Sequence, residues 1–225
     1  MSVPTTYPAT RRALHGVAEH VLAAARHQAT GRIGLRATPG GFGTPPFTVD
    51  GAARQVRIEG TDLVVADGGA ERRAPLRTIG EAAAFVGIEP GAPADVYPPA
   101  TPLQPDAPLT VDSAAATTVH GWFHLTDRAL AAFRDEHAGQ EPSIAQLWPE
   151  HFDLAITMAE VNYGGSPGDD DHEVPYLYVG PWNLDGRVGA FWNEPFGASR
   201  PHGQVRRVDE ALAFFAEGRS LTTAP

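Results

Sequence analysis

The chain has 225 residues, with 17 Arg plus Lys against 27 Asp plus Glu and a formal net charge of −10. All the basic residues are Arg, and the sequence contains neither Lys nor Cys. This composition excludes Schiff-base and P-loop lysines, thiol nucleophiles, disulfides and cysteine-ligated metal centres. The acidic balance and the scattered arginines argue against binding to a phosphate backbone. We therefore expect no nucleic-acid partner.

The apolar segments are short. None approaches the roughly 18 residues that a membrane-spanning helix requires, so no membrane partner is expected. The pair Arg11-Arg12 faintly resembles a twin-arginine export signal, but Glu19, His20 and Arg26 interrupt the apolar region that would follow. These features predict a cytoplasmic protein.

The first half of the chain alternates between helical and extended patterns. Apolar residues repeat at helical spacing over residues 9–29, and Thr78 followed by Glu81 is typical of a capping box that starts a helix. Glycine and proline dominate residues 38–46, which predicts a surface loop. The expected elements are, in order, a helix over 9–29, a strand over 33–37, a loop over 38–46, a hairpin of 55–59 with 63–66, and a helix from 78 to about 87.

Seven prolines lie between Pro90 and Pro108, so this stretch cannot form a regular helix. It is either a linker or a loop that lies extended on the body of the protein. The predicted organisation is an N-terminal α+β half over 1–89, a proline-rich connector over 90–110 and a C-terminal α+β half over 111–225. A proline-rich segment can also dock on a protein partner, which gives one functional hypothesis: an interaction protein.

The second half begins with a helix that Asp112 can cap. After this helix, the expected elements of the second half are strands over 152–156, 176–179 and 188–192, an acidic loop over 162–173, and a helix over 209–217. The predicted fold class is α+β, a mostly antiparallel sheet with helices packed on one side, built as two similar α+β halves.

Several short motifs of the second half occur in a familiar order. A helix ends in Phe133-Arg134, a loop carries Pro142-Ser143, and Trp148 precedes Phe152-Asp153-Leu154-Ala155. This order resembles a bacterial family of unknown function that is marked by a Phe-Asp-Leu-Ala strand after such a helix. Leu147-Trp148-Pro149 stands where that family has Phe-Trp-Gly. The resemblance implies a shared fold and supplies no catalytic residues.

Aromatic and polar side chains of the second half favour a ligand site. Tyr176 and Tyr178 alternate onto one side of their strand, and Trp192 is expected on a neighbouring strand. Aromatic rings with polar groups at their edges suit a sugar, a nucleoside or a flat aromatic ligand. The leading hypothesis is a small-molecule-binding protein with an aromatic-lined pocket in the C-terminal half. The predicted ligand-binding residues are Trp122, Arg128, Tyr176, Tyr178, Trp192 and Glu194.

An alternative hypothesis is a metal-dependent enzyme of the hydrolase type. His120, His124 and Asp127 fall on one stripe of the expected helix, and two imidazoles with a carboxylate can hold a divalent metal ion. A metal-bound water would then act as the nucleophile. His151 is the candidate general base, with Asp153 beside it to orient the imidazole.

Overall fold

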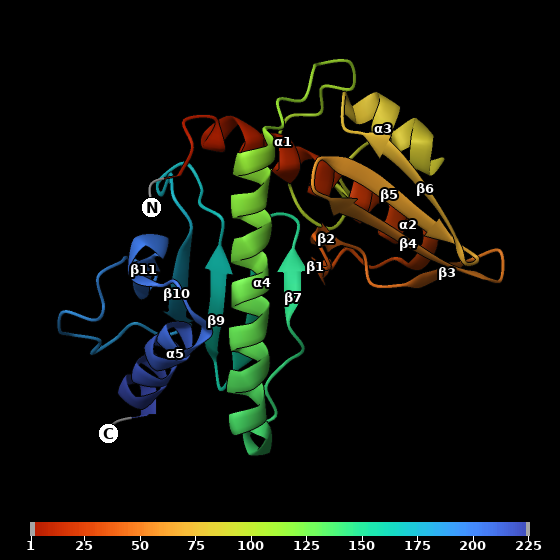
Figure 1. Cartoon of the computed structure of the whole chain (residues 1–225). Helices are drawn as coiled ribbons and strands as arrows, with labels where there is room; N and C mark the ends of the chain where they lie inside the picture. Colours follow the sequence, from red (N-terminus) through yellow and green to blue (C-terminus); the bar gives the residue numbers. More distant parts are fainter. Residues whose placement is uncertain (1–2, 224–225) are drawn as a thin grey trace. The chain divides into compact units, whose positions relative to one another are not determined.

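The computed structural model describes residues 3–223 (Figure 1). The fold is α+β, with helices and two antiparallel sheets, which confirms the predicted fold class. The chain forms two compact units: an N-terminal unit of residues 3–121 with 147–152, and a C-terminal unit of residues 122–146 with 153–223. The boundary between them falls inside the long helix α4 (Ser113–Glu136).

The N-terminal helix has the predicted position but not a uniform geometry. It consists of α1 (Tyr7–Val17), a π-helical turn η1 (Ala18–Ala23) and α2 (Ala24–Thr30), and it ends at Gly31 in the left-handed conformation. Pro8 in the first turn and Gly31 after the last one are typical start and stop signals. π-Helical turns are rare, occur mostly as single turns inside α-helices and are frequent at functional sites.

A six-stranded antiparallel sheet makes up most of the remaining N-terminal unit. Its strands follow the order β1-β2-β4-β5-β6, and β3 also pairs with β4. Their bounds are β1 (Arg36–Thr38), β2 (Gly41–Gly43), β3 (Phe47–Val49), β4 (Ala52–Glu59), β5 (Asp62–Asp67) and β6 (Ala70–Pro75). The hairpin β4–β5 confirms the predicted hairpin, whose alternating pattern buries Val56 and Ile58.

The prediction of a loop over residues 38–46 is wrong, because the centre of this segment is strand β2. Gly41 and Gly43 pair with β4, and a Cβ built on Gly41 would lie 2.1 Å from the carbonyl oxygen of Ile58. Glycine is needed here because two backbones approach closely, and the same glycines made the sequence look like a loop.

Helix α3 (Ile79–Val86) forms as the capping box predicts. The backbone N–H of Glu81 donates to Thr78 Oγ1 over 3.0 Å, and Gly87 ends the helix in the left-handed conformation. The proline-rich segment that follows is part of the N-terminal unit and is hydrogen-bonded to the rest of it, for example from Gly80 N to Pro105 O over 2.8 Å. It lies on the body of that unit as an extended loop.

The C-terminal unit is built on an antiparallel sheet with its strands in the order β11-β10-β9-β8. Strand β7 begins at Gln146 of this unit, and its other two residues belong to the N-terminal unit. The bounds are β7 (Gln146–Trp148), β8 (Asp153–Met158), β9 (Val161–Ser166), β10 (Tyr176–Pro181) and β11 (Ala198–Pro201), with short 3-10 turns η2 (Ala138–Gln140) and η3 (His202–Gln204) and helix α5 (Val208–Thr223). Among the described residues, no helix combines the length and the apolar character needed to cross a membrane.

The helices of this unit share one face of the sheet. A Cβ on Gly165 would meet Thr126 of α4, and a Cβ on Gly218 of α5 would meet Val179 (Figure 1). Side chains alternate between the faces of a strand. Tyr176 and Tyr178 precede and follow Leu177 along β10. Both tyrosines therefore lie on the face of the sheet that these helices do not cover.

Two expectations about this unit were wrong. The acidic loop expected over 162–173 begins with strand β9, whose paired glycines resemble a loop in the sequence. The strand expected over 188–192 is irregular, because Gly186 and Gly189 adopt positive φ angles of 72° and 110° and turn the chain.

Candidate functional site

A tyrosine reaches across the C-terminal sheet to an aspartate. Tyr178 on β10 pairs with Gly164 on β9, and its hydroxyl donates to Asp153 Oδ2 on β8. A Cβ on Gly164 would lie 2.6 Å from Tyr178 Cζ. The missing side chain is therefore what allows the phenol ring to lie across β9. Burial and the Asp153 carboxylate raise the pKa of Tyr178 well above its usual value, so the hydroxyl stays protonated as a donor.

The second tyrosine of β10 is held by the loop that follows β9. Tyr176 Oη donates to Asp169 Oδ2 over 2.6 Å. Asp169 Oδ1 accepts from the backbone N–H groups of Asp171 and His172 at 2.9 and 2.7 Å. Although partial burial acts to raise the pKa of Asp169, these hydrogen bonds hold it below its usual value. The carboxylate is ionised and fixes both the loop and the phenol.

His172 joins this loop to the segment before β11. Its Nε2 lies 3.1 Å from Glu194 Oε1, and its Nδ1 lies 3.4 Å from Asp169 Oδ1. Partial burial acts to lower the pKa of His172, but the two carboxylates outweigh it and the pKa is raised. Glu194 also accepts from Ser199 Oγ over 2.6 Å. Burial acts to raise the pKa of Glu194, yet the hydrogen bonds from Ser199 and His172 lower it.

These bonds form one chain of side chains, which we name the sheet-face network. Its members are Asp169, His172, Tyr176, Glu194 and Ser199. In a serine-hydrolase triad the imidazole lies between the serine and the carboxylate. Here Glu194 lies between Ser199 and His172, so the imidazole does not activate the serine. The arrangement fixes polar groups in place and does not prepare a nucleophile.

An exposed phenylalanine lies over this network. The centroid of the Phe196 ring lies 6.4 Å from the ring centroids of both Tyr176 and Tyr178, and 6.2 Å from that of His172. The centroids of the two tyrosine rings are 6.4 Å apart. Phe196 is 37% exposed. We name these four rings the Phe196 cluster. It presents an apolar surface whose edges carry oriented phenol, imidazole and carboxylate groups, as ligand sites commonly do.

The structure brings together Tyr176, Tyr178 and Glu194 of the predicted ligand-binding residues. The other three lie elsewhere, and none has a ring contact or hydrogen bond to the cluster within residues 3–223. Trp122 is buried on α4 with its ring against His202, and Arg128 is exposed on α4. Trp192 packs against Phe191 and under the guanidinium of Arg187. Phe196 thus lies beside the two tyrosines, where the sequence pattern had predicted Trp192.

The residues of the metal hypothesis have different environments. His120 is buried against Phe42, while His124 and Asp127 are half-buried. Residues 3–223 hold no group of three or more His, Asp or Glu side chains that could bind a metal ion. His151, the candidate base, is exposed in the turn before β8, and Asp153 is the partner of Tyr178. The metal-dependent enzyme stays a sequence-based prediction.

Sequence reasoning missed a second polar network, in the N-terminal unit. Glu19, fully buried on η1, accepts from the backbone N–H groups of Ala100 and Thr101 at 2.9 and 2.8 Å and from the Thr101 hydroxyl. His20 Nδ1 accepts from Ala92 N over 3.0 Å, so its Nε2 carries the proton and donates to Thr101 O over 2.9 Å. We name Glu19, His20 and Thr101 the anchor network, because Glu19 and His20 bind Thr101 and its neighbours in the proline-rich segment.

Comparisons with known proteins add no relative. No protein-family model, no curated protein and no solved structure matches the chain.

Proposed function

We propose that the chain is a small-molecule-binding protein whose ligand lies on the Phe196 cluster of the C-terminal unit. The observation that carries the proposal is the exposed ring of Phe196 beside tyrosines whose hydroxyls are already oriented by Asp153 and Asp169. A preformed site loses little conformational entropy when a ligand binds. A flat ring or the apolar face of a sugar would stack on Phe196, with its polar groups at the Glu194 and His172 edge.

We also propose that the protein acts in the cytoplasm. The support is the sequence pattern, in which Glu19 and His20 interrupt the apolar stretch after Arg11-Arg12.

Ligand-observed NMR against a library of monosaccharides, nucleosides and small aromatic acids and amines tests the proposed function. We expect Phe196→Ala to weaken the binding of each hit by about tenfold or more, because stacking area is lost. Trp182→Ala is the matched control, since Trp182 is 66% exposed in the same unit and has no ring contact with the cluster in the described chain. Hits that bind equally well to the Phe196 variant would overturn the proposal.

A further inference from the structure

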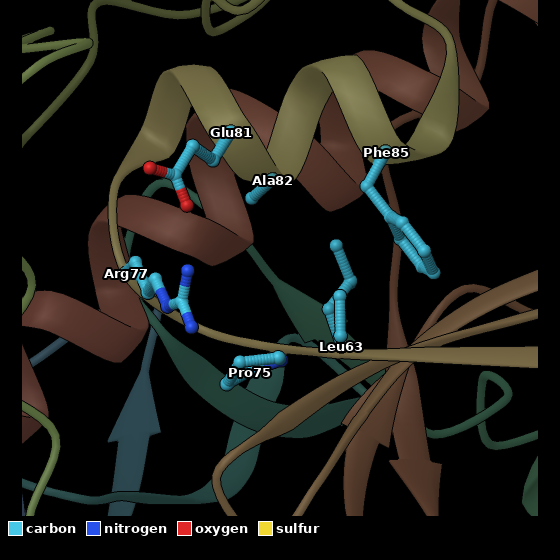
Figure 2. Close-up of a pocket in the computed structure, with 7 residues that line it drawn as sticks. Leu63, Pro75, Arg77, Glu81, Ala82 and Phe85 are labelled. Carbon is cyan, nitrogen blue, oxygen red and sulfur yellow. The ribbon is translucent and has the colours of Figure 1, made fainter.

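A cavity lies in the N-terminal unit, between α3 and the hairpin β5–β6 (Figure 2). Its volume is about 240 Å³, below the range of about 300–1,000 Å³ typical of sites for drug-sized ligands. The lining residues are Leu63, Ala74, Pro75, Arg77, Glu81, Ala82 and Phe85. The cavity suits a ligand smaller than a drug.

One end of this cavity is apolar. Leu63 and Ala82 are buried, and Phe85 extends from α3 beside Leu63 (Figure 2). The guanidinium of Arg72 lies 4.8 Å from the centroid of the Phe85 ring and donates to the Phe85 carbonyl oxygen over 3.4 Å. This cation–π contact restrains the Phe85 ring at the apolar end.

The other end carries opposite charges. Arg77 and Glu81 lie there together (Figure 2), and the part of the chain that the structure describes offers neither side chain a hydrogen bond or an ion pair. Thr78 between them is the extended helix cap, so Arg77 lies outside the helix on which Glu81 is placed. The cap thus places both charges on the same cavity, and no ion pair joins them in the described chain.

Three other arginines of strands β4 and β6 have a carboxylate partner, whereas Arg72 contacts only Phe85 among the described residues. The pairs are Arg54 with Asp67 at 2.6 Å, Arg57 with Glu71 at 2.8 Å and Arg73 with Glu59 at 2.8 Å. An arginine and a glutamate that line the same cavity without an ion pair between them offer complementary charges to a zwitterion. A guanidinium matches a carboxylate in a fork geometry, and a carboxylate accepts from an ammonium.

We infer that this cavity binds a free α-amino acid with an apolar side chain. Its carboxylate pairs with Arg77, its ammonium pairs with Glu81, and its side chain fills the space beside Leu63, Ala82 and Phe85. An anion such as isovalerate would leave Glu81 unpaired, and an amine such as isopentylamine would leave Arg77 unpaired. Both charged ends of the ligand are therefore needed.

An NMR titration of the ¹⁵N-labelled full chain with L-leucine tests this inference. We expect saturable shifts of the Leu63, Ala82 and Phe85 amides at millimolar leucine, with isovalerate and isopentylamine each binding at least about tenfold more weakly. Arg77→Gln and Glu81→Gln should each weaken leucine binding by about tenfold or more. Both side chains are exposed, and both variants keep the backbone bond to Thr78, so the fold should persist.

Arg73→Gln is the matched control, because Arg73 belongs to the same hairpin but faces Glu59 and does not line the cavity. It should bind leucine as the wild type does. Three results would overturn the inference: no shifts at these amides, isovalerate or isopentylamine binding as tightly as leucine, or a dipeptide such as Gly-Leu binding more tightly than free leucine. The last result would identify a peptide C-terminus as the occupant.

Discussion

The anchor network of the N-terminal unit and the sheet-face network of the C-terminal unit use similar side chains in different ways. Each contains a histidine and an acidic residue. Glu19 and His20 are buried, and their partners include backbone groups of residues 92–101. His172 and Glu194 are half-buried, and they bond to other side chains.

The difference indicates which network is available to a ligand. Removing a buried acceptor leaves backbone donors with no water to replace it, so the anchor network mainly stabilises the fold. A half-buried network of side chains can exchange partners with solvent or with a ligand at small cost. We therefore expect substitutions in the first network to change stability, and substitutions around the second to change binding.

The largest expected effect is at Glu19. Glu19→Ala removes the acceptor of the Ala100 and Thr101 amides, and each buried donor left unpaired costs about 1–3 kcal/mol. We expect the free energy of unfolding to fall by about 3 kcal/mol or more, measured by urea denaturation followed by circular dichroism. Amide hydrogen exchange should rise across residues 91–101.

Arg54→Gln serves as the control for that experiment. Arg54 forms a partly exposed ion pair with Asp67, and such pairs contribute about 1 kcal/mol or less. If Glu19→Ala were no more destabilising than Arg54→Gln, the anchor network would not be what holds the proline-rich segment.

A smaller effect is expected at Gly164, which gives Tyr178 its path to Asp153. In Gly164→Ala the new Cβ would lie 2.6 Å from Tyr178 Cζ and 2.7 Å from the Leu154 carbonyl oxygen. Overpacking of this kind costs about 1–3 kcal/mol, and displacing Tyr178 should also weaken ligand binding at the Phe196 cluster. Thermal unfolding and the NMR binding assay measure the two effects.

Gly121 provides the matched glycine. It lies exposed in α4, and a Cβ there meets nothing within 4 Å. Gly121→Ala should raise stability by up to about 1 kcal/mol, because alanine favours the helix more than glycine does. Equal responses of the two glycines would argue against a specific role for the space above Gly164.

The contrast also shows what the sequence could predict. The N-terminal helix, the hairpin β4–β5 and the capping of α3 follow from local periodicity and from Thr78, because the physical cause lies within a few residues. Strands β2 and β9 were missed, because their glycines are required by the close approach of Ile58 and Tyr178, which are distant in the sequence. A glycine that is required by a close approach has the same appearance as a glycine in a loop.

The candidate site divides in the same way. The alternation of Tyr176 and Tyr178 on one strand is a local signal, and it correctly placed both rings on one face. Phe196 and His172 come to the tyrosines through turns at Gly197 and Gly168, which have φ angles of 137° and 103°. The positions of these two side chains depend on loop geometry, so the local sequence pattern does not predict them.

The smallest expected effect is a pH dependence from His172. Its pKa is raised in the folded state, so its ion pairs stabilise the fold fully below the ordinary value of 6.5 and are lost as the pH rises through the folded pKa. Asp169 and Glu194 have lowered pKa values, so their contribution is present above the ordinary values of 3.8 and 4.5 and is lost on acidification. The contribution of the network should therefore be greatest between about pH 4.5 and 6.5.

His172→Gln should remove the part of the stability that falls as the pH rises above about 6.5, with a change of about 1 kcal/mol or less, because the pair is half-exposed and screened by solvent. Urea denaturation at a series of pH values, compared between wild type and variant, measures it. His27→Gln is the control, since His27 lies 3.8 Å from an exposed Asp95 and should contribute less. An unchanged pH profile in His172→Gln would mean that the imidazole is neutral in the fold, and the sheet-face network would then bind a ligand without a fixed positive charge at its edge.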